Sequence, residues 1–458
     1  MRLSIKWGFL LCLIISACSK HEQVTADPTV KLVFDKNSVL FDTIFTTQGS
    51  ITKRIKIKND HRHALTISEI KLAGASDSPY TININGINTN NATNIPIGGK
   101  DSLNIFVKVT INPNLKSLPF LVQDSIILNT NGNRQVIQLS AYGQNALFMI
   151  NQTITQNTTW NSDLPYIING TLTVKNGSSL NILPGTKVYF HKDAKLNVEG
   201  NLTIKGSLHQ PVMLCSDRLE NSYTNEPGQW KGLYLAKNGN AAIQNAIIKN
   251  ASVGITSDSL SLNSKPKLLL SNTIIKNMQV AAYIGHHSEL FAFNNLIYNC
   301  GNYLIYAVGG GNYNLKQNTF AGYNYNFPRK TAALTFSDYL SAGNYNSLNL
   351  NLTNNIIWGS LNSELEIQQK TNAPSQISVW NNLIRSAGNA FTLNHNILNV
   401  DPGFIAKESE NFELADNSIA LKKGINLTTD TNFSNYLQKD LKDQKRTFPS
   451  ALGCYERN

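Results

Sequence analysis

The sequence predicts an all-β protein in which a β-sandwich is followed by a parallel β-solenoid with a C-terminal cap. Short strands rich in Ile, Leu, Val and Thr recur along the chain, and no long segment has the period of an amphipathic helix. An Asn-aliphatic motif recurs six times in the second half, at intervals close to one solenoid turn. Charged residues make up only 15% of the chain, and Asn, Thr and Ser take their place.

The first residues have the features of an export signal. Arg2 and Lys6 precede an apolar run of 11 residues, Trp7 to Ala17. A membrane-spanning helix needs about 20 residues, so this run is too short to span. The run ends in Ile15-Ser16-Ala17-Cys18, which resembles the lipobox of bacterial lipoproteins.

That resemblance implies cleavage before Cys18 and lipid attachment to Cys18. Residues 1–17 are then the signal peptide, and the polar segment 18–29 is a tether. We expect a lipid-anchored protein of the bacterial cell envelope, with the outer membrane as the favoured location. The sequence leaves open whether it faces the periplasm or the cell surface. An ordinary secretory signal with a chance cysteine is the alternative.

The chain is basic, with a formal net charge of +11. Without Arg2 and Lys6, 38 basic residues face 29 acidic ones, and such a surplus favours anionic partners such as acidic polysaccharides. A diffuse excess without function is the alternative. No nucleic-acid-binding motif accompanies the charge, so no nucleic-acid partner is expected. Cys215, Cys300 and Cys454 are odd in number and lack metal-ligand spacing, which favours buried free thiols and leaves their pairing open.

Residues 28–145 show several short strands of period two, separated by Asn, Gly and Pro turns, which predicts a β-sandwich. Ile51 to Lys58 and Ser102 to Val109 are the clearest examples. The sequence Ile97-Gly98-Gly99 before a strand, Asn112-Pro113 after it, and the close at Leu139 to Gly143 resemble immunoglobulin-like domains of the Hydin and major-sperm-protein type. The resemblance implies a spacer or adhesion module.

Residues 146–400 carry the solenoid pattern. In Thr171 to Arg218, apolar pairs at alternating positions recur in very short strands between glycine and Asn-Gly turns. This stretch resembles the right-handed parallel β-helices of pectate-lyase-like proteins. A β-propeller needs longer strands and a period of about 40 residues, and it fits poorly.

The Asn-aliphatic motif predicts a column of stacked asparagines. Asn tolerates left-handed backbone angles at tight corners, and amides stacked about 4.8 Å apart can hydrogen-bond along the axis. The second residues of the six motifs are expected to align: Asn245, Asn272, Asn295, Asn318, Asn355 and Asn382.

Residues 401–458 are similar to the closing region of bacterial β-helix surface proteins, through Asp401-Pro402-Gly403-Phe404, Asn417-Ser418-Ile419-Ala420 and Gly453-Cys454-Tyr455-Glu456. Terminal rungs of a solenoid need shielding from edge pairing. The segment is therefore assigned as the C-terminal cap.

No strong catalytic constellation is present. The chain lacks the adjacent Asp pair and Gly-His-Gly of polygalacturonase-like enzymes and the Arg-x-Pro-x-x-Arg of pectate lyases. The best remaining cluster is His286, His287 and Glu289, with Tyr283 nearby, in which His is a candidate base and Glu an acid. Two exposed loop histidines are the alternative.

A Tyr-rich stretch is the candidate ligand-binding surface, because exposed aromatic rings stack on sugars and cations hold carboxylates. Aromatic stacks inside the solenoid are the alternative. Its members are Tyr303, Tyr306, Tyr313, Tyr323, Tyr325, Arg329 and Lys330.

Two functions remain open. The favoured one is a non-catalytic adhesion or glycan-binding β-helix, and the alternative is a lyase or hydrolase of an acidic polysaccharide, supported by fold analogy alone. No cofactor and no metal site are expected, although an enzyme of this kind could use calcium. The expected partners are the membrane, through the lipid, and an anionic polysaccharide.

Overall fold

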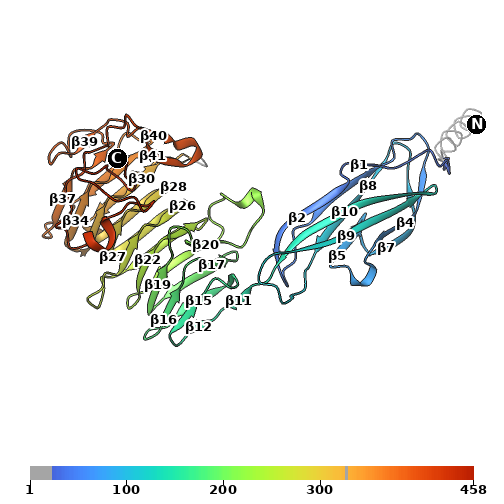
Figure 1. The fold of residues 1–458 in the computed structure, drawn as a ribbon, viewed down its shortest axis with the longest axis horizontal. Coiled ribbons are helices and arrows are strands. Elements are labelled where there is room, and N and C mark those ends of the chain that lie inside the picture. Colours follow the sequence, from blue (N-terminus) through green and yellow to red (C-terminus); the bar gives the residue numbers. More distant parts are fainter. Residues whose placement is uncertain (1–22, 325–327, 458) are drawn as a thin grey trace, which may run out of the picture. The chain divides into compact units, whose positions relative to one another are not determined.

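The computed structural model describes residues 23–324 and 328–457, and it divides into two compact units at Asn145/Ala146. Figure 1 shows both units built almost wholly of strands. None of the helices within the described residues is long and apolar enough to span a membrane. Cys18 and Tyr325, both singled out by the sequence, lie outside the described residues.

The N-terminal unit is a sandwich of two five-stranded sheets. Its strands alternate buried and exposed residues; in β8, for example, Ile105 and Val107 are buried between outward-facing neighbours. The inward residues of both sheets form one core that includes Ile55, Ile67 and Leu128. Period-two patterning thus places one face of each sheet in the core.

The first sheet contains, in spatial order, β1 (Val33–Phe34), β3 (Lys53–Lys58), β8 (Ser102–Val109), β5 (Tyr80–Ile84) and β6 (Ile87–Asn88). The second contains β2 (Ser38–Phe45), β10 (Asn133–Gln144), β9 (Phe120–Thr130), β4 (Leu65–Leu72) and β7 (Asn91–Ile97). A short helix, η1 (Ala75–Asp77), follows β4.

The C-terminal unit is a right-handed parallel β-helix with three faces, as predicted. Every strand of a face pairs in parallel with the equivalent strand of the next rung, for example Leu172 with Leu196 and Leu196 with Leu233. These aligned aliphatic residues are buried and stack into one continuous core. Each rung therefore covers the apolar side of its neighbours.

The first face contains β12 (Thr153–Ile154), β15 (Thr171–Val174), β18 (Lys195–Val198), β21 (Gly232–Leu235), β24 (Val253–Asp258), the first halves of β27 (Ala281–Phe293) and β29 (Tyr303–Lys316), β31 (Leu334–Ser337) and β36 (Leu365–Gln368). The second face contains β13 (Thr158–Trp160), β16 (Ser179–Ile182), β19 (Asn201–Lys205), β22 (Asn240–Gln244), β25 (Leu268–Ser271), the second halves of β27 and β29, β34 (Leu348–Thr353) and β37 (Gln376–Trp380).

The third face contains β11 (Leu147–Ile150), β14 (Tyr166–Asn169), β17 (Lys187–Phe190), β20 (Val212–Ser216), β23 (Ala246–Lys249), β26 (Ile274–Met278), β28 (Leu296–Cys300), β30 (Thr319–Gly322), β35 (Ile356–Gly359), β38 (Leu383–Ile384) and β39 (Ile397–Leu398). Outside the faces lie the pairs β32 (Tyr339–Ser341) with β33 (Asn344–Tyr345) and β40 (Phe404–Ala406) with β41 (Asn411–Leu414), and the short helices η2 (Asn221–Tyr223), η3 (Lys407–Ser409) and η4 (Phe433–Leu437).

A sharp bend joins the first and second faces in β27 and β29. His287 has a φ of 48°, and opposite it Gly309, Gly310 and Gly311 have φ values of 77°, 72° and 125°. Glycine reaches these angles without a steric penalty, so the two long strands turn the corner without a loop. In the preceding rung, the loop from Ser259 to Lys267 makes the same turn.

A buried ladder of asparagines runs along the solenoid axis. Asn295, Asn318, Asn355 and Asn382 lie on successive rungs, and each Nδ2 donates to the Oδ1 of the next residue at 2.9 Å. Each Oδ1 also accepts the backbone N–H of the residue below it, at 2.9–3.0 Å. Asn396 continues the ladder beyond Asn382, at 3.2 Å. Because these buried amides are paired, the ladder fixes the register of neighbouring rungs.

The predicted column is corrected at Asn245 and Asn272. Strand pairing aligns Ile247 with Ile274 and Ile274 with Leu296, so Ala246 and Thr273 stand in the ladder position. Asn245 and Asn272 belong to an adjacent column of corner residues with φ between 47° and 58°, which continues through Asn294, Gln317, Asn354 and Asn381. Each Asn-Asn pair of the later rungs contains one residue of the corner column and one residue of the ladder. The sequence motif did not distinguish these two columns.

The segment expected to cap the solenoid lies along its flank. Asn354 Nδ2 donates to Ile425 O at 3.0 Å and Asn354 Oδ1 accepts from Ile425 N at 2.9 Å. Asn294 Nδ2 likewise donates to Lys439 O at 2.8 Å. We call residues 415–457 the C-terminal strap. Its described contacts follow the corner column over several rungs, because the side-chain amides of that column hydrogen-bond to the backbone of the strap.

The three cysteines predicted as small hydrophobes are buried and free. Cys215 and Cys300 belong to faces of the solenoid, and Cys454 lies in the strap. Burial raises the pKa of each thiol to about 12. The thiols therefore stay protonated and unreactive at neutral pH.

We expect Asn318→Ala to lower the free energy of unfolding by about 1–3 kcal/mol, because it removes the acceptor of the Asn295 backbone N–H and one of the two acceptors of Asn295 Nδ2. Urea denaturation followed by circular dichroism measures the change. Asn349→Ala, at an exposed position of β34, is the control and should change stability by less than about 0.5 kcal/mol. Equal effects of both substitutions would contradict a structural role for the buried ladder.

Candidate functional site

The predicted histidine cluster is divided between two environments at the bend of β27. His286 faces outward on the first face, where its Nδ1 lies 2.9 Å from Asp258 Oδ1. His287 occupies the bend itself, and its Nδ1 contacts Gly309 O at 3.0 Å. The imidazole rings of His286 and His287 therefore do not face a common substrate position.

Tyr234 and Asp258 complete a group with His286 that sequence reasoning missed. The Tyr234 hydroxyl donates to Asp258 Oδ2, while Asp258 Oδ1 pairs with His286. The hydrogen bond to Asp258 is the largest of the effects that raise the pKa of Tyr234 to about 12. The three residues come from β21, β24 and β27, so only the rung register brings them together. This arrangement is suited to proton transfer by an oriented histidine.

Both carboxylate oxygens of Glu289 make hydrogen bonds that hold the structure together. Its Oε1 accepts from Asn312 Nδ2 at 3.0 Å, and its Oε2 accepts from the backbone N–H of Lys267 at 3.1 Å. Lys267 is buried, and its Nζ donates to Ala236 O at 2.5 Å and Lys237 O at 2.8 Å. Glu289 therefore anchors the corner loop and does not join the histidines as an acid.

The predicted aromatic surface is dispersed. Tyr303 and Tyr306 stack on each other, with centroids 4.5 Å apart and partly exposed rings. Tyr313 is buried against Phe336 because it occupies an inward position of β29. Tyr323 packs against Phe412 of β41.

Arg329 and Lys330, which the sequence grouped with these tyrosines, have different surroundings. Arg329 is buried in an ion pair with Glu364, whereas Lys330 is exposed. The strand period and the buried carboxylate of Glu364 thus remove Tyr313 and Arg329 from the surface. Adjacency in sequence did not reveal this.

Two neighbouring hollows on the second face form the candidate binding site. Their volumes are about 330 and 480 Å³, and the pairing of Leu269 with Phe291 joins them. We call the pair the amide groove. The outward side chains along it are Asn201, Thr203, Asn240, Ala242, Leu269, Phe291, Asn312, Asn314, Asn349, Asn351, Gln376 and Ser378.

The amide groove is bounded and almost uncharged. Lys265 and Pro266 of the corner loop border one end, together with Tyr436 of the strap. Of the described residues that line it, Lys265 alone carries a charge. Amides along it are already ordered, since Asn349 Nδ2 donates to Asn312 Oδ1 at 2.9 Å. Asn314 Oδ1 is buried and has no hydrogen-bond partner among the described residues.

No group of three or more His, Cys, Asp or Glu side chains suited to a metal occurs in residues 23–324 and 328–457. The Tyr234–Asp258–His286 group supplies one carboxylate and one imidazole, fewer ligands than calcium or zinc sites require. The expected absence of a metal and of a cofactor stays a prediction.

Comparison with known proteins identifies one family model in the C-terminal unit. Residues 152–259, less than half of the chain, match the family model of the pectate-lyase like β-helix domain. This range ends one residue after Asp258. The β-helix and this match fit a glycan-binding or glycan-active protein. No curated protein matches the chain.

Solved structures resemble the chain distantly. A family 123 glycoside hydrolase from Clostridium perfringens is 11% identical over 29% of this chain and 30% of its own, with a TM-score of 0.20. A GH87 α-1,3-glucanase from Streptomyces thermodiastaticus is 9% identical over 76% of this chain and 88% of its own, with a TM-score of 0.23. The PapD-like domain 7 of human CEP192 is 9% identical over 28% of this chain and 94% of its own, with a TM-score of 0.18. The chain thus spans under a third of the first of these enzymes.

We expect the corner loop to respond to pH through Lys267. Burial lowers the pKa of Lys267 to about 8, below its unfolded value near 10.5, so the unfolded chain binds the extra proton between these values. Relative to Lys267→Met, the wild-type free energy of unfolding should therefore rise by roughly 1–3 kcal/mol from pH 7.5 to pH 10. Urea titrations at several pH values measure it. Lys265→Met, at an exposed position of the same loop, is the control for the loss of one lysine. A flat Lys267 difference would refute the assignment.

Proposed function

We propose that the protein is a lipid-anchored cell-envelope protein whose amide groove binds a neutral polysaccharide without cleaving it. The observation that carries the proposal is the groove itself, in which successive rungs present ordered amides beside apolar side chains. The lipid anchor rests on the Ile15-to-Cys18 motif, which lies outside the described residues. The family match to a β-helix domain supports a glycan ligand.

The groove's chemistry favours sugar hydroxyls over charged groups. Asn and Gln side chains each offer an acceptor and two donors, which suits the paired donor and acceptor character of a hydroxyl. Because the groove offers one ammonium group, at Lys265, a polyanion would find few cations there.

The geometry favours a polymer over a small sugar. Leu269 and Phe291 are outward apolar residues at the centre of the groove, and an apolar sugar face can cover them. On either side, the strand register repeats the polar positions; Asn314 aligns with Asn351, and Asn351 with Ser378. A chain of sugars lying along the axis therefore meets similar groups at each rung.

We expect the double substitution Asn314→Leu with Asn351→Leu to weaken binding of neutral polysaccharide about tenfold or more, because two hydrogen-bonding amides are lost at similar volume. Affinity electrophoresis of the purified protein in gels with soluble glucans and mannans measures retention. Asn181→Leu is the matched control, since Asn181 precedes the groove in the same outward column. Unchanged retention of the double variant, or equal loss with Asn181→Leu, would contradict the proposal.

Cleavage of a polysaccharide is the second candidate function, favoured by the oriented Tyr234–Asp258–His286 group. Asp258 fixes the ring of His286, whose Nε2 has no hydrogen-bond partner in the described part of the chain. A histidine oriented in this way can serve as a general acid or base. The stacked Tyr303 and Tyr306 lie on the same face and could support a sugar ring.

If the protein cleaves glycans, His286→Ala should lower the rate about 10²-fold or more, the usual contribution of a general acid or base. His287→Ala should keep most of the activity, because His287 Nδ1 contacts a backbone carbonyl. New reducing ends and unsaturated ends, measured over a panel of neutral and acidic polysaccharides, report the reaction. Absence of both products for the wild type, or equal loss in the two variants, excludes this candidate.

A further inference from the structure

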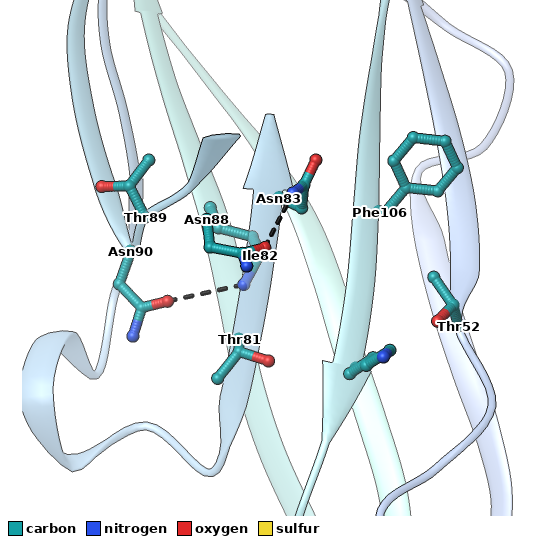
Figure 2. Close-up of a pocket in the computed structure, with 9 residues that line it drawn as sticks. Thr52, Thr81, Ile82, Asn83, Asn88, Thr89, Asn90 and Phe106 are labelled. Carbon is teal, nitrogen blue, oxygen red and sulfur yellow. Dashed lines mark hydrogen bonds between the residues drawn. The ribbon is translucent and has the colours of Figure 1, made fainter. Parts of the chain in front are cut away.

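A hollow of about 780 Å³ lies on the outer face of the first sheet of the N-terminal sandwich (Figure 2). Phe106 and Lys108 of β8 line it together with Thr81 and Asn83 of β5. Hydrogen bonds order its other wall, where Asn83 Nδ2 donates to Asn88 Oδ1 at 2.7 Å and Ile82 N donates to Asn90 Oδ1 at 3.4 Å. Figure 2 shows Phe106 across the hollow from this wall.

Phe106 projects outward from a strand whose adjacent aliphatic residues face the core. Ile105 and Val107 are fully buried, and the alternation of β8 leaves 38% of Phe106 exposed. Burial of the ring would be favourable, so its exposure on the wall of a hollow has no structural benefit. An exposed ring beside hydroxyl and amide groups is a platform on which a sugar ring stacks.

Several basic side chains share the outer face of the sheet with this ring. Arg54 stands directly opposite Phe106 in the strand pairing, and Lys108 follows on the same face of β8. Lys56 and Lys58 continue the outward row of β3. Within the described residues, none of these four side chains has an acidic partner within 4.0 Å, whereas Lys71 elsewhere in the unit pairs with Glu69. The surface is therefore a local source of positive potential.

We propose that this hollow, which we call the sandwich site, binds an acidic polysaccharide of the uronic-acid type. One sugar ring stacks on Phe106, and its carboxylate is held by Arg54 and Lys108. The hydroxyls of Thr52 and Thr81 and the amide of Asn90 face the sugar hydroxyls. This site is independent of the amide groove, which is nearly uncharged and belongs to the other unit.

The combination of groups selects this ligand class. A free phosphate or a nucleic-acid backbone would use the cations but would leave the neutral hydroxyl and amide wall without partners. A neutral glycan would use the ring but would leave Arg54 and Lys108 unused. A polymer with a carboxylate and several hydroxyls on each ring uses both sets of groups.

The test measures binding of polygalacturonate and alginate oligomers to the purified full-length chain by calorimetry, at 20 and 200 mM NaCl. Phe106→Ala should weaken binding about tenfold with little change in thermal stability, because the ring is exposed. Arg54→Gln with Lys108→Gln should weaken binding more than tenfold and should reduce its dependence on salt. The control removes the same charge at exposed sites of the same unit, Lys36→Gln with Lys116→Gln, and should stay within twofold of wild type.

Three results would overturn the proposal: no binding of either acidic oligomer by the wild type, unchanged binding in Phe106→Ala, or an equal loss in the charge control. The last result would indicate a nonspecific response to net charge. Retention of neutral glucans and mannans distinguishes binding at the amide groove from binding at the sandwich site. It should be unaffected by Phe106→Ala, and Asn314→Leu with Asn351→Leu should leave acidic-oligomer binding intact.

Discussion

The register between successive rungs is the constraint on which the C-terminal unit depends. Parallel backbone hydrogen bonds align each strand with the one beneath it, and the buried ladder from Asn295 to Asn396 fixes that alignment at one corner. A one-residue shift would remove every amide from its partner and would point the aliphatic stacks outward. The same register brings Tyr234, Asp258 and His286 together and builds the amide groove.

The amide groove and the sandwich site differ in charge. The solenoid groove presents amides and apolar side chains, whereas the outer sheet of the sandwich presents a row of cations around an exposed ring. The surplus of basic residues is therefore not spread evenly over the candidate sites. Net charge by itself pointed to an anionic partner, but it did not say which unit would meet it.

The fold was predictable because its determinants are periodic. Alternation of apolar residues in strands such as Lys195–Val198 predicted the inward faces, and the spacing of Asn-aliphatic motifs predicted the rungs. The site was less predictable, since it joins outward residues separated by whole rungs. Asp258 lies 28 positions before His286, and nothing local in either sequence segment indicates their contact.

The prediction failed where a single residue decides a side chain's environment. Asn245 was placed one column from its true position because its motif contains one asparagine, whereas Asn294-Asn295 contains two. The Tyr-rich stretch leaves open whether its side chains lie on the surface or inside the solenoid, and strand parity and the buried carboxylate of Glu364 place Tyr313 and Arg329 inside. To predict the environment of such a side chain, one must know the register of a strand that is distant in sequence.

The strap makes completion of the solenoid dependent on the end of the chain. Phe293 and Leu296 are covered by residues more than 100 positions later, including Leu437 and Leu441. As the polypeptide is synthesised with its N-terminus first, the rungs can stack one after another, yet this apolar flank stays open to water until the last residues arrive. A chain cut short before the strap would keep these apolar residues exposed to water, and such a surface favours aggregation.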